Sequence, residues 1–167
     1  DNPRVRAIWE ESTAGDFKVP DSFDFRIRSC GRLDDAGLVL AGLRHMQDEL
    51  STIAEQGDAG NLNVTKIRNV VAPHTFAVEI GGDTFALGHC LRHQLFATSC
   101  NEGGPLLLIG FDKDHAHDAR GKLRMTFRND SSAVNASHIT ARAAAEVAEI
   151  YRGLHVAAEA AFGRREG

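Results

Sequence analysis

Apolar and polar residues alternate in several short stretches of the chain, a period of two that predicts half-buried β-strands. These stretches are residues 22–30, 62–68, 75–80 and 122–128. Residues 106–111 instead form a short apolar run between turn signals, which predicts a strand at the centre of a sheet. The last alternating stretch, residues 122–128, is predicted to be an exposed strand.

Three other stretches place apolar residues three and four positions apart, which is the spacing of one helix face. The spacing predicts an amphipathic helix over about 34–55, a short helix over about 84–97 and a long helix from Asn135 onward. Along the long helix, apolar positions recur in steps of four and three at Ala143, Val147, Ile150, Leu154, Ala157 and Ala161. A repeat of about 3.5 residues is typical of a helix that packs along another long helix, so the sequence predicts a partner helix.

The order of these elements predicts an α+β fold, with an antiparallel sheet, a short helix and a long C-terminal helix. The length of 167 residues allows one domain with an extension. Residues 1–56 are predicted to be an N-terminal extension made of an arm, a strand and a helix, and residues 62–167 are predicted to be the domain itself. A polar, glycine-containing loop lies between the two parts.

Composition argues against several classes of protein. No apolar run approaches the ~18–20 residues that span a bilayer, so a membrane protein is not expected. The net charge of −4 disfavours an autonomous nucleic-acid binder, and the arginines of the predicted strands are more simply interpreted as a solvated face than as a phosphate-binding patch. Three cysteines without a C-x-x-C pair argue against a disulfide framework or a structural zinc site, and favour a reducing compartment.

Two groups of side chains are candidates for chemistry. Cys90 and His93 lie three residues apart on the predicted short helix, so they would occupy neighbouring faces as a nucleophile and its base. Cys90 also belongs to an apolar stripe, and the favoured interpretation is a buried cysteine that acts as a small hydrophobe. His115 and His117 have the chemistry of metal ligands, but a solvated loop is the favoured interpretation there. The sequence contains no phosphate-binding loop and no serine-hydrolase motif.

From residue 62 onward, the order of elements and a set of motifs resemble the small α-like subunit of archaeal and eukaryotic RNA polymerases. This family includes the archaeal L subunit, the eleventh subunit of polymerase II and the small subunit shared by polymerases I and III. Its marker E-D-H-T-L-G-N-L-L-R corresponds to residues 83–92, where Leu87, Gly88, Leu91 and Arg92 match outright.

Further correspondences follow along the chain, and the resemblance spans about residues 62–163. Gly110-Phe111 takes the place of the family's G-Y, residues 123–126 that of its R-I-Q-T strand, and Phe162 that of a phenylalanine near the end of the long helix. The marker's His and Thr are replaced by Phe85 and Ala86, and the prolines of a P-H-P motif are missing around His115. The chain therefore resembles a divergent member of the family.

The resemblance implies the dimerisation fold of the bacterial α subunit and a non-catalytic, architectural role in the nucleus, or in the nucleolus for polymerase I. The chain would pair with the larger α-like subunit and form the platform on which the catalytic subunits assemble. It would carry no catalytic residue, metal or cofactor, and would touch DNA indirectly at most. The N-terminal extension favours the subunit shared by polymerases I and III, with the polymerase II subunit as the alternative.

The resemblance also implies where the partner binds. The expected interface residues are Leu87, Gly88, Leu91, Arg92, Leu95, Val147, Ile150 and Leu154. Gly88 is expected to let helices approach closely, while the leucines around it supply apolar contact. The alternative from another class is a small enzyme that uses Cys90 with His93.

Overall fold

The computed structural model describes residues 3–4, 24–68, 72–82, 84–113, 115 and 118–163. It divides the chain into two units, Asp1–Asp35 and Ala36–Gly167. The sequence predicted the boundary at residue 56, so the structure moves it by about one helix. The reason is that this helix packs into the core of the second unit.

A four-stranded antiparallel sheet forms one layer of the second unit. Its strands are β1 (Val64–Ile67), β2 (Thr75–Ile80), β3 (Leu106–Asp112) and β4 (Gly121–Phe127). The order across the sheet is β1-β2-β4-β3. With three helices in the described part of the chain, the last of them long and C-terminal, the structure confirms the predicted α+β class.

The positions of β3 and β4 in the sheet are the reverse of those predicted. β4 pairs with β2 on one side and β3 on the other, so the predicted exposed strand is central. β3 is an edge strand, and its register shifts between Leu106 and Leu108, which leaves Leu107 and Leu108 58% and 64% exposed. The pairing partners of a strand lie far away in sequence, so a short apolar run alone does not establish that a strand is central.

The strand predicted over residues 22–30 does not form in the described part of that stretch, residues 24–30. Phe25 is 83% exposed and Ile27 44% exposed. Residues 22 and 23 lie outside the described residues. A strand needs a neighbour for its backbone hydrogen bonds, and none of the described strands pairs with this segment.

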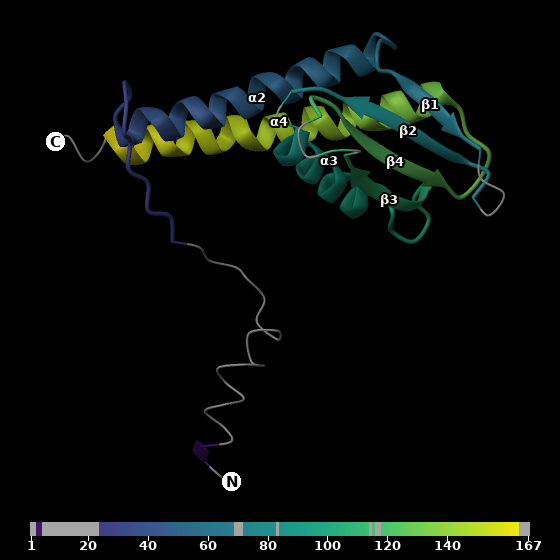
Figure 1. Cartoon of the computed structure of the whole chain (residues 1–167), viewed down its shortest axis with the longest axis horizontal. Coiled ribbons are helices and arrows are strands. Elements are labelled where there is room, and N and C mark those ends of the chain that lie inside the picture. Colours follow the sequence, from purple (N-terminus) through teal and green to yellow (C-terminus); the bar gives the residue numbers. More distant parts are fainter. Residues whose placement is uncertain are drawn as a thin grey trace. The chain divides into compact units, whose positions relative to one another are not determined.

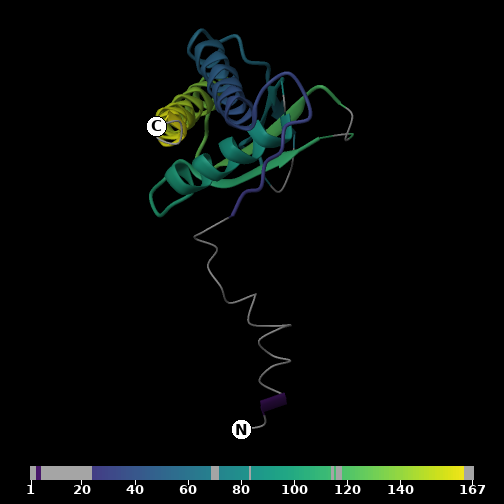
Figure 2. The same ribbon diagram turned by 90° about the vertical axis from the view of Figure 1, so that its left-hand side faces the viewer.

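Three helices accompany the sheet: α2 (Asp35–Asp58), α3 (Thr84–Ser99) and α4 (Ala133–Gly163). α3 packs on β3 and β4, and α4 packs on β1 and β2. α2 runs beside α4 in the opposite direction (Figures 1 and 2). None of the helices in the described ranges combines the length and the apolar character that a membrane span requires.

Backbone and hydroxyl hydrogen bonds define where the helices begin and end. The Asn135 amide donates to Ser132 Oγ at 3.2 Å, which caps the start of α4. At the end of α2, the amides of Gly60 and Asn61 donate back to the carbonyls of Gly57 and Gln56. Gly60 has φ +71°, the left-handed conformation that this type of helix stop requires.

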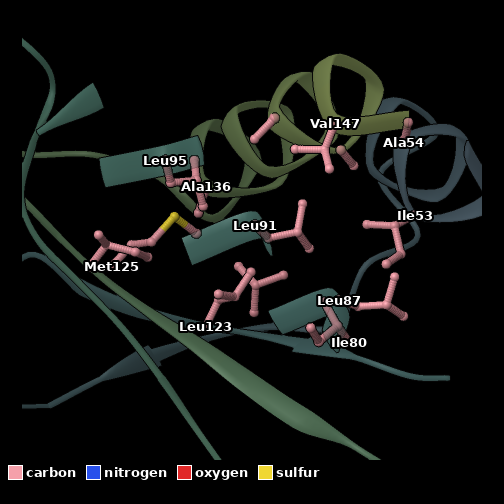
Figure 3. Close-up of a cluster of buried hydrophobic side chains, with 14 of the residues drawn as sticks. Ile53, Ala54, Ile80, Leu87, Leu91, Leu95, Leu123, Met125, Ala136 and Val147 are labelled. Atoms are coloured by element: carbon pink, nitrogen blue, oxygen red, sulfur yellow. The ribbon is translucent and has the colours of Figure 1, made fainter. Parts of the chain in front are cut away.

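α2 is part of the core rather than part of an extension. Leu50, Ile53 and Ala54 are at most 9% exposed, and they belong to the same cluster as the buried sheet residues. Figure 3 shows Ile53 and Ala54 in this cluster. The buried Ser137 hydroxyl of α4 donates to the Gly57 carbonyl at 2.9 Å. A Cβ at Gly57 would lie 2.7 Å from Ala141 Cβ, so only glycine permits this close approach of the two helices. These contacts explain why the unit begins at Ala36 and not after α2.

Truncation of Ile53 tests this role of α2. Ile53 is 5% exposed, so Ile53→Ala is expected to lower the free energy of unfolding by about 2–5 kcal/mol, measured by denaturant titration. Leu38→Ala on the same helix is the control, because Leu38 is 42% exposed and should cost less than about 1 kcal/mol. Equal, small effects of the two substitutions would show that α2 is not part of the core.

Candidate partner interface

The leucine stripe of α3 builds the core of its own chain. Leu87, Leu91 and Leu95 are each 0% exposed. Figure 3 shows them among side chains of the sheet, α4 and α2, including Leu123, Val147 and Ile53. The sequence predicted these leucines at a partner interface. These side chains have no exposed surface, because this face of α3 is covered by the sheet and by α4.

Gly88 also allows a close contact, but not with another helix. A Cβ at Gly88 would lie 2.2 Å from Phe111 Cε2, so the Phe111 ring of β3 occupies the space above it. The same ring meets His89 and Phe85 edge to face, with centroid distances of 5.3 and 6.2 Å. The Lys113 ammonium lies 4.7 Å from the Phe85 centroid. Gly88 therefore fixes the first turns of α3 against β3 through an aromatic cluster.

Polar contacts join the side of α3 to α4. Gln94 Nε2 donates to Glu146 Oε2 at 2.7 Å. One turn nearer the start of α3, Cys90 Sγ and Tyr151 Oη share a hydrogen bond of 3.5 Å. Burial, together with this hydrogen bond, raises the pKa of Tyr151 to about 12. These contacts set the register in which α3 lies on α4.

The apolar repeat of α4 divides into a buried half and an exposed half. Ala143 and Val147 are 2% and 6% exposed and pack into the core. Ala148 is the last buried residue of the helix, and beyond it Ile150 and Leu154 are 53% and 49% exposed. Ala157 and Ala161, which continue the repeat, are also exposed. We call Ile150, Leu154, Ala157 and Ala161 the exposed seam.

α3 carries a second, outward stripe that the sequence reasoning missed. Phe85 and Phe96 are 48% and 64% exposed, and His89 and Arg92 lie between them and are exposed as well. The four positions step by four, three and four, so they share one helix face. This spacing is readable in the sequence, but the leucine stripe on the other face is the more regular apolar pattern. Of the predicted interface residues, the structure leaves Arg92, Ile150 and Leu154 accessible.

Of the candidate chemical groups, the structure describes Cys90, His93 and His115. Cys90 is half-buried and shares its hydrogen bond with Tyr151, whereas His93 is exposed. His117 lies outside the described residues, and the described His115 is exposed. Among the described residues, no group of three or more His, Cys, Asp or Glu side chains is placed to hold a metal ion.

The sequence matches no protein-family model, and no curated protein sequence matches it.

The contact between Gly88 and Phe111 predicts that Gly88→Ala lowers stability in the parent chain and raises it when the Phe111 ring is absent. Gly88→Ala gains about 1 kcal/mol of helix propensity, but it forces the Phe111 ring aside at a cost of about 1–3 kcal/mol. The variant is therefore expected to be less stable than the parent in denaturant titration. In a Phe111→Ala background the steric cost is absent, so Gly88→Ala should raise stability. A destabilising effect of equal size in both backgrounds would contradict the contact.

The environment of Tyr151 predicts that its hydroxyl ionises at a higher pH than that of a free tyrosine. Tyr151 is the only tyrosine, so the tyrosinate absorbance of the folded chain is expected to appear near pH 12 instead of near pH 10. A raised pKa in the folded state stabilises the fold below pH 10, and this contribution is lost as the pH rises from 10 towards 12. An absorbance midpoint near pH 10 with the helical circular dichroism intact would contradict the burial of this hydroxyl.

Proposed function

We propose that the chain is a non-catalytic, architectural subunit of a nuclear DNA-dependent RNA polymerase, the small α-like subunit that pairs with a larger α-like subunit. The pair would form the platform on which the catalytic subunits assemble. The subunit shared by polymerases I and III is the favoured identity, with a nucleolar location for polymerase I, and the polymerase II subunit is the alternative. The fold proposed with it is the dimerisation fold of the bacterial α subunit.

The positions of the motif residues support this proposal. The residues that match the family marker lie on α3, the element after β2, and Gly110-Phe111 lies on β3, which follows α3. The long helix that the family uses for pairing corresponds to α4, which has 31 residues. The order β2, α3, β3, β4, α4 is thus the order that the resemblance implies.

The single observation that carries the proposal is the exposed seam of α4. Apolar residues continue at the same spacing after the helix has left the core, so the fold of this chain alone does not account for them. A regular apolar strip on a long helix is typical of a helix–helix contact with another chain.

The free energy available from burial of the exposed seam limits how small the interface can be. Full burial of one large apolar side chain contributes roughly 1.5–3 kcal/mol, and Ile150 and Leu154 have about half of their surface still to bury. Two such residues do not offset the ~4 kcal/mol or more that association costs. A stable pair therefore also needs exposed apolar groups outside α4, such as Phe96 of α3.

A charge in the exposed seam tests the proposal. Leu154→Glu should leave the fold intact, because Leu154 is 49% exposed in the isolated chain. In the pair it would bury an unpaired carboxylate, which costs several kcal/mol, so recovery of the larger α-like subunit with the tagged chain should fall by about a hundredfold or more. The measurement is quantitative mass spectrometry of the proteins that co-purify.

The matched control is Ala145→Glu. Ala145 is exposed and lies nine residues before Leu154, about two and a half turns, so it is on the opposite side of α4. This variant introduces the same charge into the same helix and should retain the partner. Equal recovery with both variants, or the absence of any polymerase subunit from the parent sample, would contradict the proposed function.

A further inference from the structure

Residues 24–28 have the side-chain pattern of a strand but do not form a strand in the structure. Phe25 and Ile27 alternate with Asp24, Arg26 and Arg28, so an extended backbone would place two apolar side chains on one face and three charged ones on the other. Phe25 is 83% exposed, which is high for a phenylalanine. No strand of the described sheet pairs with the segment.

The segment ends at a compact turn that leads into α2. The Ser29 amide donates to Asp35 Oδ1 at 2.6 Å, and the Ser29 hydroxyl donates to the Leu33 carbonyl. The Gly31 amide donates to Ser29 Oγ at 3.3 Å, which closes the turn. These hydrogen bonds organise the residues between the segment and the first turn of α2, while residues 24–28 themselves are exposed.

An extended segment with alternating side chains satisfies its backbone by adding to the edge of a sheet. Strand addition pairs its amides and carbonyls, and it brings side chains of the same face opposite each other. Phe25 and Ile27 would then need apolar neighbours on the partner strand, and Arg26 and Arg28 would need carboxylates. Residues 24–30 are not helical, so they present no helical face.

We propose that residues 24–28 bind a second protein by strand addition, with a partner edge strand that places apolar side chains against Phe25 and Ile27 and carboxylates against Arg26 and Arg28. We call residues 24–28 the strand arm. The observations that carry the proposal are the period of two, the exposed Phe25 and the two arginines on the opposite face. It does not depend on which assembly contains the chain.

The test compares amide hydrogen exchange of the peptide covering residues 24–30 in the isolated full chain and in the assembly purified through a tag on it. Strand addition hydrogen-bonds every second amide of an edge strand. About half of the amides of the strand arm should therefore exchange at least about tenfold more slowly in the assembly than in the isolated chain. Unchanged exchange in the assembly overturns the proposal. A contact of Arg26 and Arg28 with nucleic acid alone would give this unchanged result.

Two variants at one position separate backbone pairing from side-chain burial. Ile27→Pro removes an amide and fixes the backbone, so it should abolish the slow exchange of the neighbouring amides. Ile27→Val keeps the amide and the strand preference, and it should behave as the parent chain does. Equal protection in both variants would overturn strand addition.

The same samples separate this inference from the proposed function. Polymerase subunits in the assembly with an unprotected strand arm would overturn the inference and leave the function standing. A protected strand arm in an assembly that lacks polymerase subunits would support strand addition and contradict the proposed function.

Discussion

α3 has one continuous apolar stripe, and covering it determines how the second unit is built. Leu87, Leu91 and Leu95 lose all contact with water only because the sheet, α4 and α2 each supply part of the cover. α2 also approaches α4 closely at Gly57, and this approach depends on the absence of a side chain there. The loss of any one of these neighbours would expose leucine side chains, so the helix, the sheet and the cover are stable only together.

Local pattern predicted the elements of the unit well, because the period of apolar residues is a property of neighbouring positions. The strand expected at residues 75–80 is Thr75–Ile80, and the helix expected at about 84–97 is Thr84–Ser99. The arrangement of these elements in the sheet was harder to predict from the sequence. The pairing of β4 between β2 and β3 joins residues that are far apart in sequence, and nothing in residues 106–111 indicates that they lie at an edge.

A local pattern also could not tell which of the predicted interface residues are exposed. A stripe of leucines at helical spacing indicates burial, but it does not tell whether the cover comes from the same chain or from another. In α3 the cover is internal, whereas in α4 one regular repeat begins inside the core at Ala143 and ends in solvent at Ala161. The repeat places Ile150 and Leu154 on one helix face with Val147, and only the structure separates the exposed pair from the buried Val147. Phe85 and Phe96 escaped notice because two polar residues, His89 and Arg92, share their stripe.

The transition in α4 at Ala148 divides the helix into two parts of unequal stability. The residues before it are held by the core, while beyond it Tyr151, His155, Ala158 and Phe162 are only half-buried. No side chain of this end is fully buried, so it is expected to open at a smaller free energy than the core does. A molecule that covered the exposed seam would have to order the helix as it bound. Ordering the helix would offset part of the favourable binding free energy. Association would also show a larger negative heat-capacity change than its contact area alone would give.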